Sequence, residues 1–154
     1  MVIFKCLFVL FFFLSDQLIK LKIVNNFDYG EEINIIDNII SLTFIKNTGA
    51  AWSILENQTL FLIIFSTPII VGIIVLLIKT SRSKFVRGLG LSVMLAGALG
   101  NYFDRIRLGY VIDMIKLDFY QFPIFNFADV YLFVGLIITL FSYSHFQLKR
   151  TRSI

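Results

Sequence analysis

The sequence predicts an all-α membrane protein with four transmembrane helices and a small β-like lobe outside the membrane. Hydrophobic residues make up 58% of its 154 residues, and the mean hydropathy of +0.85 exceeds that of an ordinary soluble domain. The apolar residues fall in runs of about 20, which is the length of a helix that crosses a bilayer. We therefore expect one integral membrane domain, residues 1–154.

The first predicted span covers residues 3–24 and becomes polar in its second half. Asp16 and Lys20 lie four residues apart there, which places them on one face of a helix. One interpretation is a pair that neutralises itself inside the membrane. The other is a pair that braces a polar site at the outer end of the bundle, and the two are compatible.

The segment 25–58 is too polar to cross a membrane. Turn-forming residues separate short stretches of β-like composition at 33–35 and 41–45, which predicts one or two hairpins resting on the membrane. The stretch 47–53, Asn-Thr-Gly-Ala-Ala-Trp-Ser, combines an amide with small residues that allow another backbone to approach. From composition alone, a plain turn before the next span explains it equally well.

Three further spans are predicted at 59–78, 85–103 and 128–146, with a second outer segment at 104–127. The third span carries small residues at every fourth position, which favours close packing against another helix. These residues are Gly88, Ser92, Ala96 and Gly100.

The distribution of charge predicts the orientation. The loop 79–87 and the tail 147–154 are basic and contain no acid, whereas 25–58 carries five acids against the single Lys46. Basic loops stay on the cytoplasmic side, so we expect both termini inside and 25–58 outside. The basic residues form no continuous stripe, so nucleic-acid binding is not indicated.

Polar residues crowd the end of the third span, at Asn101, Asp104, Arg105 and Arg107. For Arg107 the simplest interpretation is an ion pair at the membrane surface. For Arg105 we also consider a fixed donor that orients a carboxylate through paired hydrogen bonds.

Two aspartates carry the strongest chemical signal. Asp113 lies between Ile112 and Met114 in an apolar stretch, where an ionisable group is costly and usually functional. Asp129 follows Asn126 by three residues, a spacing that is also typical of a helix cap. Two buried carboxylates that meet can share one proton, so that one serves as a base and the other as an acid.

The other reactive side chains offer little. Cys6 is the only cysteine, so neither an internal disulfide nor a cysteine metal cluster is possible. His145 is the only histidine and lies beside the basic tail, where an interfacial position explains it.

Four motifs in order resemble the lipoprotein signal peptidase (signal peptidase II) family of the bacterial cytoplasmic membrane. They are Asp16-Gln17-Leu18-Ile19-Lys20, the stretch 47–53, the stretch 100–113 and Phe125-Asn126-Phe127-Ala128-Asp129. Small departures occur at Ile19, Ala96 and Met114, where the family commonly has other residues.

The resemblance implies an intramembrane aspartic endopeptidase with Asp113 and Asp129 as its catalytic pair. It implies that the enzyme removes signal peptides from prolipoproteins, on the amino side of a cysteine that bears diacylglycerol. It also implies an active site at the outer leaflet, no metal or other cofactor, and inhibition by globomycin. The residues that would line or support the site are Asp16, Lys20, Asn47, Gly49, Asn101, Arg105 and Asn126.

Two other classes of function agree less well with the sequence. A proton-coupled transporter could use the acids as a relay, but it predicts broken helices near mid-membrane and often an internal repeat. No repeat is visible in the sequence. A purely structural membrane protein would leave Asp113 unexplained.

Overall fold

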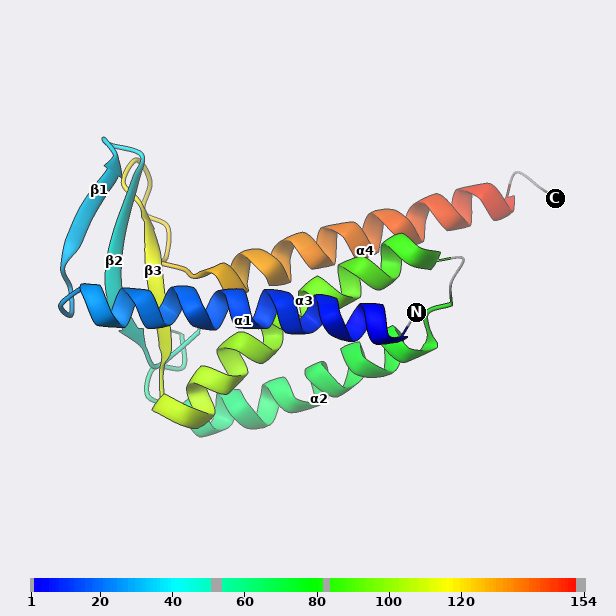
Figure 1. Ribbon diagram of the computed structural model, residues 1–154, viewed down its shortest axis with the longest axis horizontal. Coiled ribbons are helices and arrows are strands. Elements are labelled where there is room, and N and C mark those ends of the chain that lie inside the picture. Colours follow the sequence, from blue (N-terminus) through cyan, green and yellow to red (C-terminus); the bar gives the residue numbers. More distant parts are fainter. Residues whose placement is uncertain (1, 51–53, 82–83, 152–154) are drawn as a thin grey trace.

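The computed structural model describes residues 2–50, 54–81 and 84–151, with side chains described as far as residue 144. In the described residues a small sheet stands at one end of a bundle of long helices (Figure 1). The first turn of α1, the end of α2, the start of α3 and the last turns of α4 all lie at the other end. In chain order the elements are α1 (Val2–Asn26), β1 (Glu32–Ile36), β2 (Ile40–Asn47), α2 (Thr59–Lys79), α3 (Phe85–Leu108), β3 (Val111–Leu117) and α4 (Phe127–Thr151).

Helix α3 is the centre of the bundle, because it packs against α1, α2 and α4. The small residues predicted to form a packing face are all buried. A Cβ atom built on Gly100 would lie 2.6 Å from Asp16 Oδ2 and 3.1 Å from Ala128 Cβ. Glycine is therefore required where α1, α3 and α4 meet.

The helices turn large apolar side chains outward, as is expected of a protein surrounded by lipid. Three of the described helical segments are long and apolar enough to cross a membrane, namely Val2–Asn26, Thr59–Lys79 and Phe127–Ser144. The protein is thus a mostly helical integral membrane protein with a small sheet.

The sheet is three-stranded and antiparallel, in the order β1-β2-β3. The hairpin of β1 and β2 confirms the prediction for 25–58. Strand β3 was not predicted, because its apolar residues do not alternate cleanly with polar ones. Its Ile112 and Met114 pack with Ile23 of α1, while Asp113 pairs with Ile45 of β2 and faces the other way.

Helix α3 is five residues longer than the predicted span 85–103. Its last turns carry the polar residues Asn101, Asp104 and Arg105, so the helix continues past the apolar stretch. Gly109 ends it in the left-handed conformation, with φ of 81°, and its N–H donates to the carbonyl of Arg105 at 3.1 Å. This turn brings β3, and therefore Asp113, back over the end of the bundle.

Candidate active site

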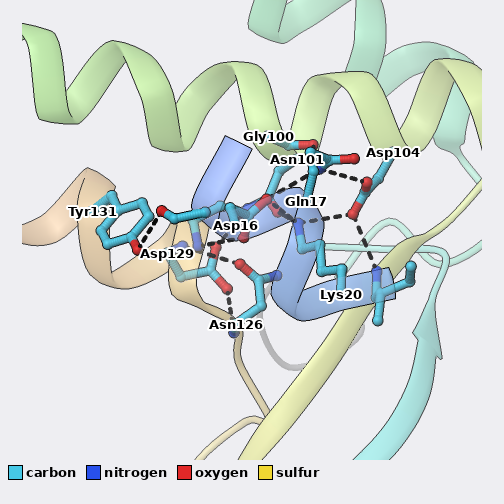
Figure 2. A network of polar contacts seen from close by, with 12 residues as sticks. Asp16, Gln17, Lys20, Gly100, Asn101, Asp104, Asn126, Asp129 and Tyr131 are labelled. Atoms are coloured by element: carbon cyan, nitrogen blue, oxygen red, sulfur yellow. Dashed lines mark hydrogen bonds and ion pairs between the residues drawn. The ribbon is translucent and has the colours of Figure 1, made fainter. Parts of the chain in front are cut away.

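A buried lysine joins α1 to α3 near the sheet (Figure 2). Lys20 Nζ lies 3.0 Å from Asp16 Oδ2 and 2.8 Å from Asp104 Oδ2. Its third partner is Asn101 Oδ1, at 3.0 Å. An ammonium group has three donors, so all of them are used, and the pair predicted for Asp16 and Lys20 is confirmed as part of a larger cluster.

The same cluster fixes the start of β3 and the start of α4. Asp104 accepts hydrogen bonds from Gln17 Nε2 at 3.1 Å and from the N–H of Ile112 at 3.4 Å. Asp16 Oδ1 accepts from the N–H of Ala128 at 3.0 Å. Neither Gln17 nor Asp104 was among the residues predicted to support the site.

Asp129 is both part of a helix cap and part of the site. Its N–H donates to Asn126 Oδ1, and its Oδ2 accepts from the N–H of Asn126, both at 3.1 Å. This reciprocal pair is a capping box, as the spacing predicted. The other oxygen of Asp129, Oδ1, accepts from Asn101 Nδ2 at 2.7 Å.

Asp113 is held by two amides. Its Oδ1 accepts from Asn126 Nδ2 at 2.7 Å, and its Oδ2 accepts from Asn47 Nδ2 at 2.8 Å. Asn126 therefore contacts both aspartates and fixes β3 relative to the first turn of α4.

Three asparagines are oriented in the same sense around this pair. In each, the amide oxygen accepts from an anchored donor, so the amide nitrogen must face a carboxylate. The donor is the ammonium of Lys20 for Asn101, the N–H of Gly49 for Asn47 at 2.8 Å, and the N–H of Asp129 for Asn126. The three amide nitrogens bond to three of the carboxylate oxygens, and the backbone N–H of Asn126 bonds to the fourth, so all four accept a hydrogen bond.

The two aspartates line one cavity of about 240 Å³. A second cavity of about 310 Å³ adjoins it and shares Asp113 and Asn47 with it. Burial raises the pKa of Asp113 to about 7, and the negative charge of Asp129 contributes to this rise. The lining residues of the first cavity are Asn47, Ala50, Asn101, Arg105, Val111, Asp113, Phe122, Pro123, Ile124, Phe125, Asn126 and Asp129.

Arg105 lies in this cavity but binds backbone. Its Nη2 donates to the carbonyl of Gly49 at 2.9 Å, so the expected paired bond to a carboxylate is not observed in the described part of the chain. Gly49 is tightly enclosed, because a Cβ atom there would lie 2.8 Å from the carbonyl oxygen of Ile54. The close approach predicted for this motif is thus present, while its residues 51–53 lie outside the described residues.

All nine predicted site residues lie in one connected region. Asp113, Asp129, Asn47, Asn101, Arg105 and Asn126 line the cavity. Lys20 and Gly49 contact residues that line it, and Asp16 joins the region through Lys20. Within the described residues, no group of three or more His, Cys, Asp or Glu side chains could hold a metal ion.

The fold and the site define a class of membrane-embedded protein in which one carboxylate from a sheet and one from a helix share a polar cavity. The family described as signal peptidase (SPase) II matches residues 8–145. The chain belongs to this family.

Individual relatives agree with this assignment. A lipoprotein signal peptidase of Enterococcus faecalis is 48% identical over 122 residues, covering 79% of this chain and 76% of the relative. That of Latilactobacillus sakei is 51% identical over 124 residues, covering 80% and 82%. A bacterial membrane enzyme solved by the in meso method at 2.3 Å is 31% identical with a TM-score of 0.85, covering 92% of this chain and 87% of that one.

Proposed function

We propose that this protein is an aspartic endopeptidase that removes the signal peptide from diacylglyceryl-modified prolipoproteins, with Asp113 and Asp129 as its catalytic pair. The observation that carries the proposal is the shared cavity in which Asn126 donates hydrogen bonds to both carboxylates, through its amide nitrogen to Asp113 and through its backbone N–H to Asp129. Relatives named lipoprotein signal peptidase support the substrate.

The geometry suits general acid–base hydrolysis. Burial raises the pKa of both aspartates, and that of Asp113 to about 7. We assign to Asp113 the proton that the pair shares in the resting enzyme. Asp129 then takes a proton from a water molecule as the water oxygen attacks the scissile carbonyl carbon. Asp113 gives its proton to the nitrogen of the scissile peptide bond. The C–N bond then breaks and releases the amine of the lipidated cysteine.

The supporting residues act by position. Asn47, Asn101 and Asn126 hold the carboxylates in one geometry, and Lys20 holds Asn101 in turn. Arg105 secures the loop at Gly49 against the cavity. Preorganised groups of this kind lower the barrier because no reorganisation is needed at the moment of reaction.

Helix lengths and charge support the proposed membrane arrangement. Helix α3 has 24 residues, about 36 Å at 1.5 Å per residue, which is enough for a fourth span in the single domain 1–154. It is less apolar than the others because its neighbours cover it. The basic end of the bundle lies in the cytoplasm of a bacterium, and the sheet and active site lie at the outer leaflet of the cytoplasmic membrane.

This placement matches the substrate. The two acyl chains of a lipidated cysteine stay in the outer leaflet while the adjacent peptide bond reaches the cavity between β3 and α4. Globomycin is the expected inhibitor, and we expect activity in the presence of a metal chelator.

The experiment is cleavage of a purified diacylglyceryl-modified prolipoprotein by the purified protein. Asp113→Asn and Asp129→Asn should each abolish release of the signal peptide while the protein remains folded. Asp37→Asn is the matched control, since Asp37 is exposed in the turn between β1 and β2, and it should cleave at the wild-type rate. Near-normal turnover by either of the first two variants would refute the pair.

A further inference from the structure

Apart from the two cavities at the active site, a groove lies between α1 and α3. It is on the face of β3 that turns away from Asp113. Its volume is about 320 Å³. Ile112 lines it, whereas Val111 and Asp113 line the active-site cavity, as the alternation of a strand requires. The two spaces have no lining residue in common in the described part of the chain. The occupant of this groove is therefore separate from the scissile peptide.

The walls of the groove have the dimensions of a lipid chain. It follows α1 from Phe13 to Val24, about 16 Å at 1.5 Å per residue, which is roughly half of a hydrocarbon core of about 30 Å. The side chains that face it are mainly apolar, and Leu18 is 59% exposed at its edge. The groove thus runs through one leaflet and ends near the sheet.

Two cations stand where the groove meets the sheet. Arg107 lines it, with its guanidinium carbon 5.5 Å from the ring centre of Phe103. Tyr110 also lines it, and Lys46 Nζ lies 5.3 Å from the ring centre of Tyr110. Aromatic rings attract cations at such distances, so Arg107 is held in the wall of the groove and Lys46 is held beside its residue Tyr110, while Lys46 also lines the cavity of about 310 Å³.

Neither cation is neutralised within the described part of the chain, where the ion pairs involve only Lys20 and Lys116. The surface ion pair expected for Arg107 is therefore absent there. Both side chains are exposed. An apolar groove with uncompensated positive charge at its outer end is complementary to a molecule with an anionic head and an apolar tail.

We propose that the groove between α1 and α3 binds an anionic phospholipid, with an acyl chain between the helices and its phosphate at Arg107 and Lys46. A guanidinium can donate two parallel hydrogen bonds to a phosphate, and an ammonium adds a point charge. Basic residues at a membrane surface attract anionic headgroups. An acidic peptide would satisfy the charges but not the apolar groove that continues into the membrane.

The test compares two lipids on the full-length protein in a nonionic detergent. Dioleoylphosphatidylglycerol and dioleoylphosphatidylcholine have the same chains and differ in net charge. Native mass spectrometry should show tighter retention of the anionic lipid, and the same lipid should raise the thermal midpoint more. Arg107→Gln and Lys46→Gln should each weaken its binding about fivefold.

Two further variants distinguish a specific lipid-binding site from non-specific attraction between the lipid headgroup and the basic residues of the protein. Lys22→Gln removes an exposed lysine of α1 that does not line the groove, and it should retain the lipid as wild type does. Leu18→Trp fills the groove while keeping every charge, and it should weaken binding. Equal retention of the two lipids by wild type, an equal effect of Lys22→Gln and Arg107→Gln, or unchanged binding by Leu18→Trp would each overturn the proposal.

Discussion

Asn126 combines two tasks in one side chain. Its amide oxygen caps α4, and its amide nitrogen bonds to Asp113 on the neighbouring strand. A cap alone is worth about 0.5–2 kcal/mol, whereas misplacement of a reacting group can reduce a rate on the order of a hundredfold. Folding stability therefore reports mainly on the amide oxygen, which caps the helix, and turnover reports mainly on the amide nitrogen, which holds Asp113.

We expect Asn126→Ala to lower the thermal midpoint modestly and the rate of cleavage per folded molecule by about a hundredfold. Both quantities are measured on the same preparation. The matched control is Asn26→Ala, because Asn26 is an exposed residue that bonds only locally, to the carbonyl of Lys22. A lowered midpoint with an unchanged rate per folded molecule would reduce Asn126 to a helix cap.

Arg105→Ala should also lower turnover strongly in protein that still folds, because the loop at Gly49 loses its tie to α3. Arg107→Ala is the control, two residues further along the same helix. The side chain of Arg107 lines the groove between α1 and α3 and not the active-site cavity. If the two variants cleave at the same rate, Arg105 has no positioning role.

The raised pKa of Asp113 predicts a pH dependence of both rate and stability. A carboxyl whose pKa rises from 3.8 to about 7 on folding holds a proton in the folded state that the unfolded chain has lost. Folding stability from this group therefore falls as pH rises between these values. Turnover should fall as pH rises through about 7, because the pair loses its proton.

The measurement is the thermal midpoint of wild type and of Asp113→Asn from pH 5 to pH 8. Wild type should lose more stability over this range than the variant, which has no titrating group at that position. Parallel curves for the two proteins would contradict the assignment of this proton to Asp113.

The sequence identified the two aspartates for different reasons. Asp113 is an acid in an apolar stretch, and Asp129 matches a family motif. Asp104 was noted only as one of a crowd of interfacial polar residues, because its partner Lys20 lies 84 positions away. No local pattern reveals such a contact. The bond from Arg105 to the carbonyl of Gly49 was also missed. Every residue has a backbone carbonyl, so the sequence does not indicate which carbonyl accepts.

At the scale of elements, close packing of α3 depends on glycine at particular positions. Gly100→Ala should disrupt the junction, because the added carbon would lie 2.6 Å from Asp16 Oδ2. We expect a lower thermal midpoint and a lower rate. Gly72→Ala in α2 is the matched control, since nothing lies within 4 Å of a Cβ atom there. It should be neutral or slightly stabilising. Equal effects of the two substitutions would exclude the packing argument.

Helices and strands could be predicted where a local feature of the sequence marked them. The apolar runs predicted α1, α2 and α4 to within a few residues, except that α4 continues to Thr151. The hairpin of β1 and β2 followed from turn residues. Strand β3 was missed because its buried half, Val111–Met114, contacts protein on both faces, and this removes the alternation that marks a half-exposed strand.

At the scale of the whole molecule, the proposed four spans and the charge asymmetry predict a topology that can be tested. In a Cys6→Ser background, the cysteine of the variant Asp37→Cys should react with an impermeant maleimide added from outside the cell. A cysteine at Ser83 should react only after the membrane is opened, because basic loops remain inside. Labelling of the Ser83 position in intact cells would reverse the topology.

The proposed catalytic pair is divided between two layers of the molecule. Asp113 belongs to the sheet and Asp129 to the bundle, and the layers are joined at this point by Asn126 and by the bond from Ile112 to Asp104. Tilting of the sheet would therefore separate the carboxylates without altering either one. A ligand that binds between the sheet and the bundle would therefore inhibit without touching either carboxylate, and substitutions that confer resistance to it would lie at this junction rather than in the cavity.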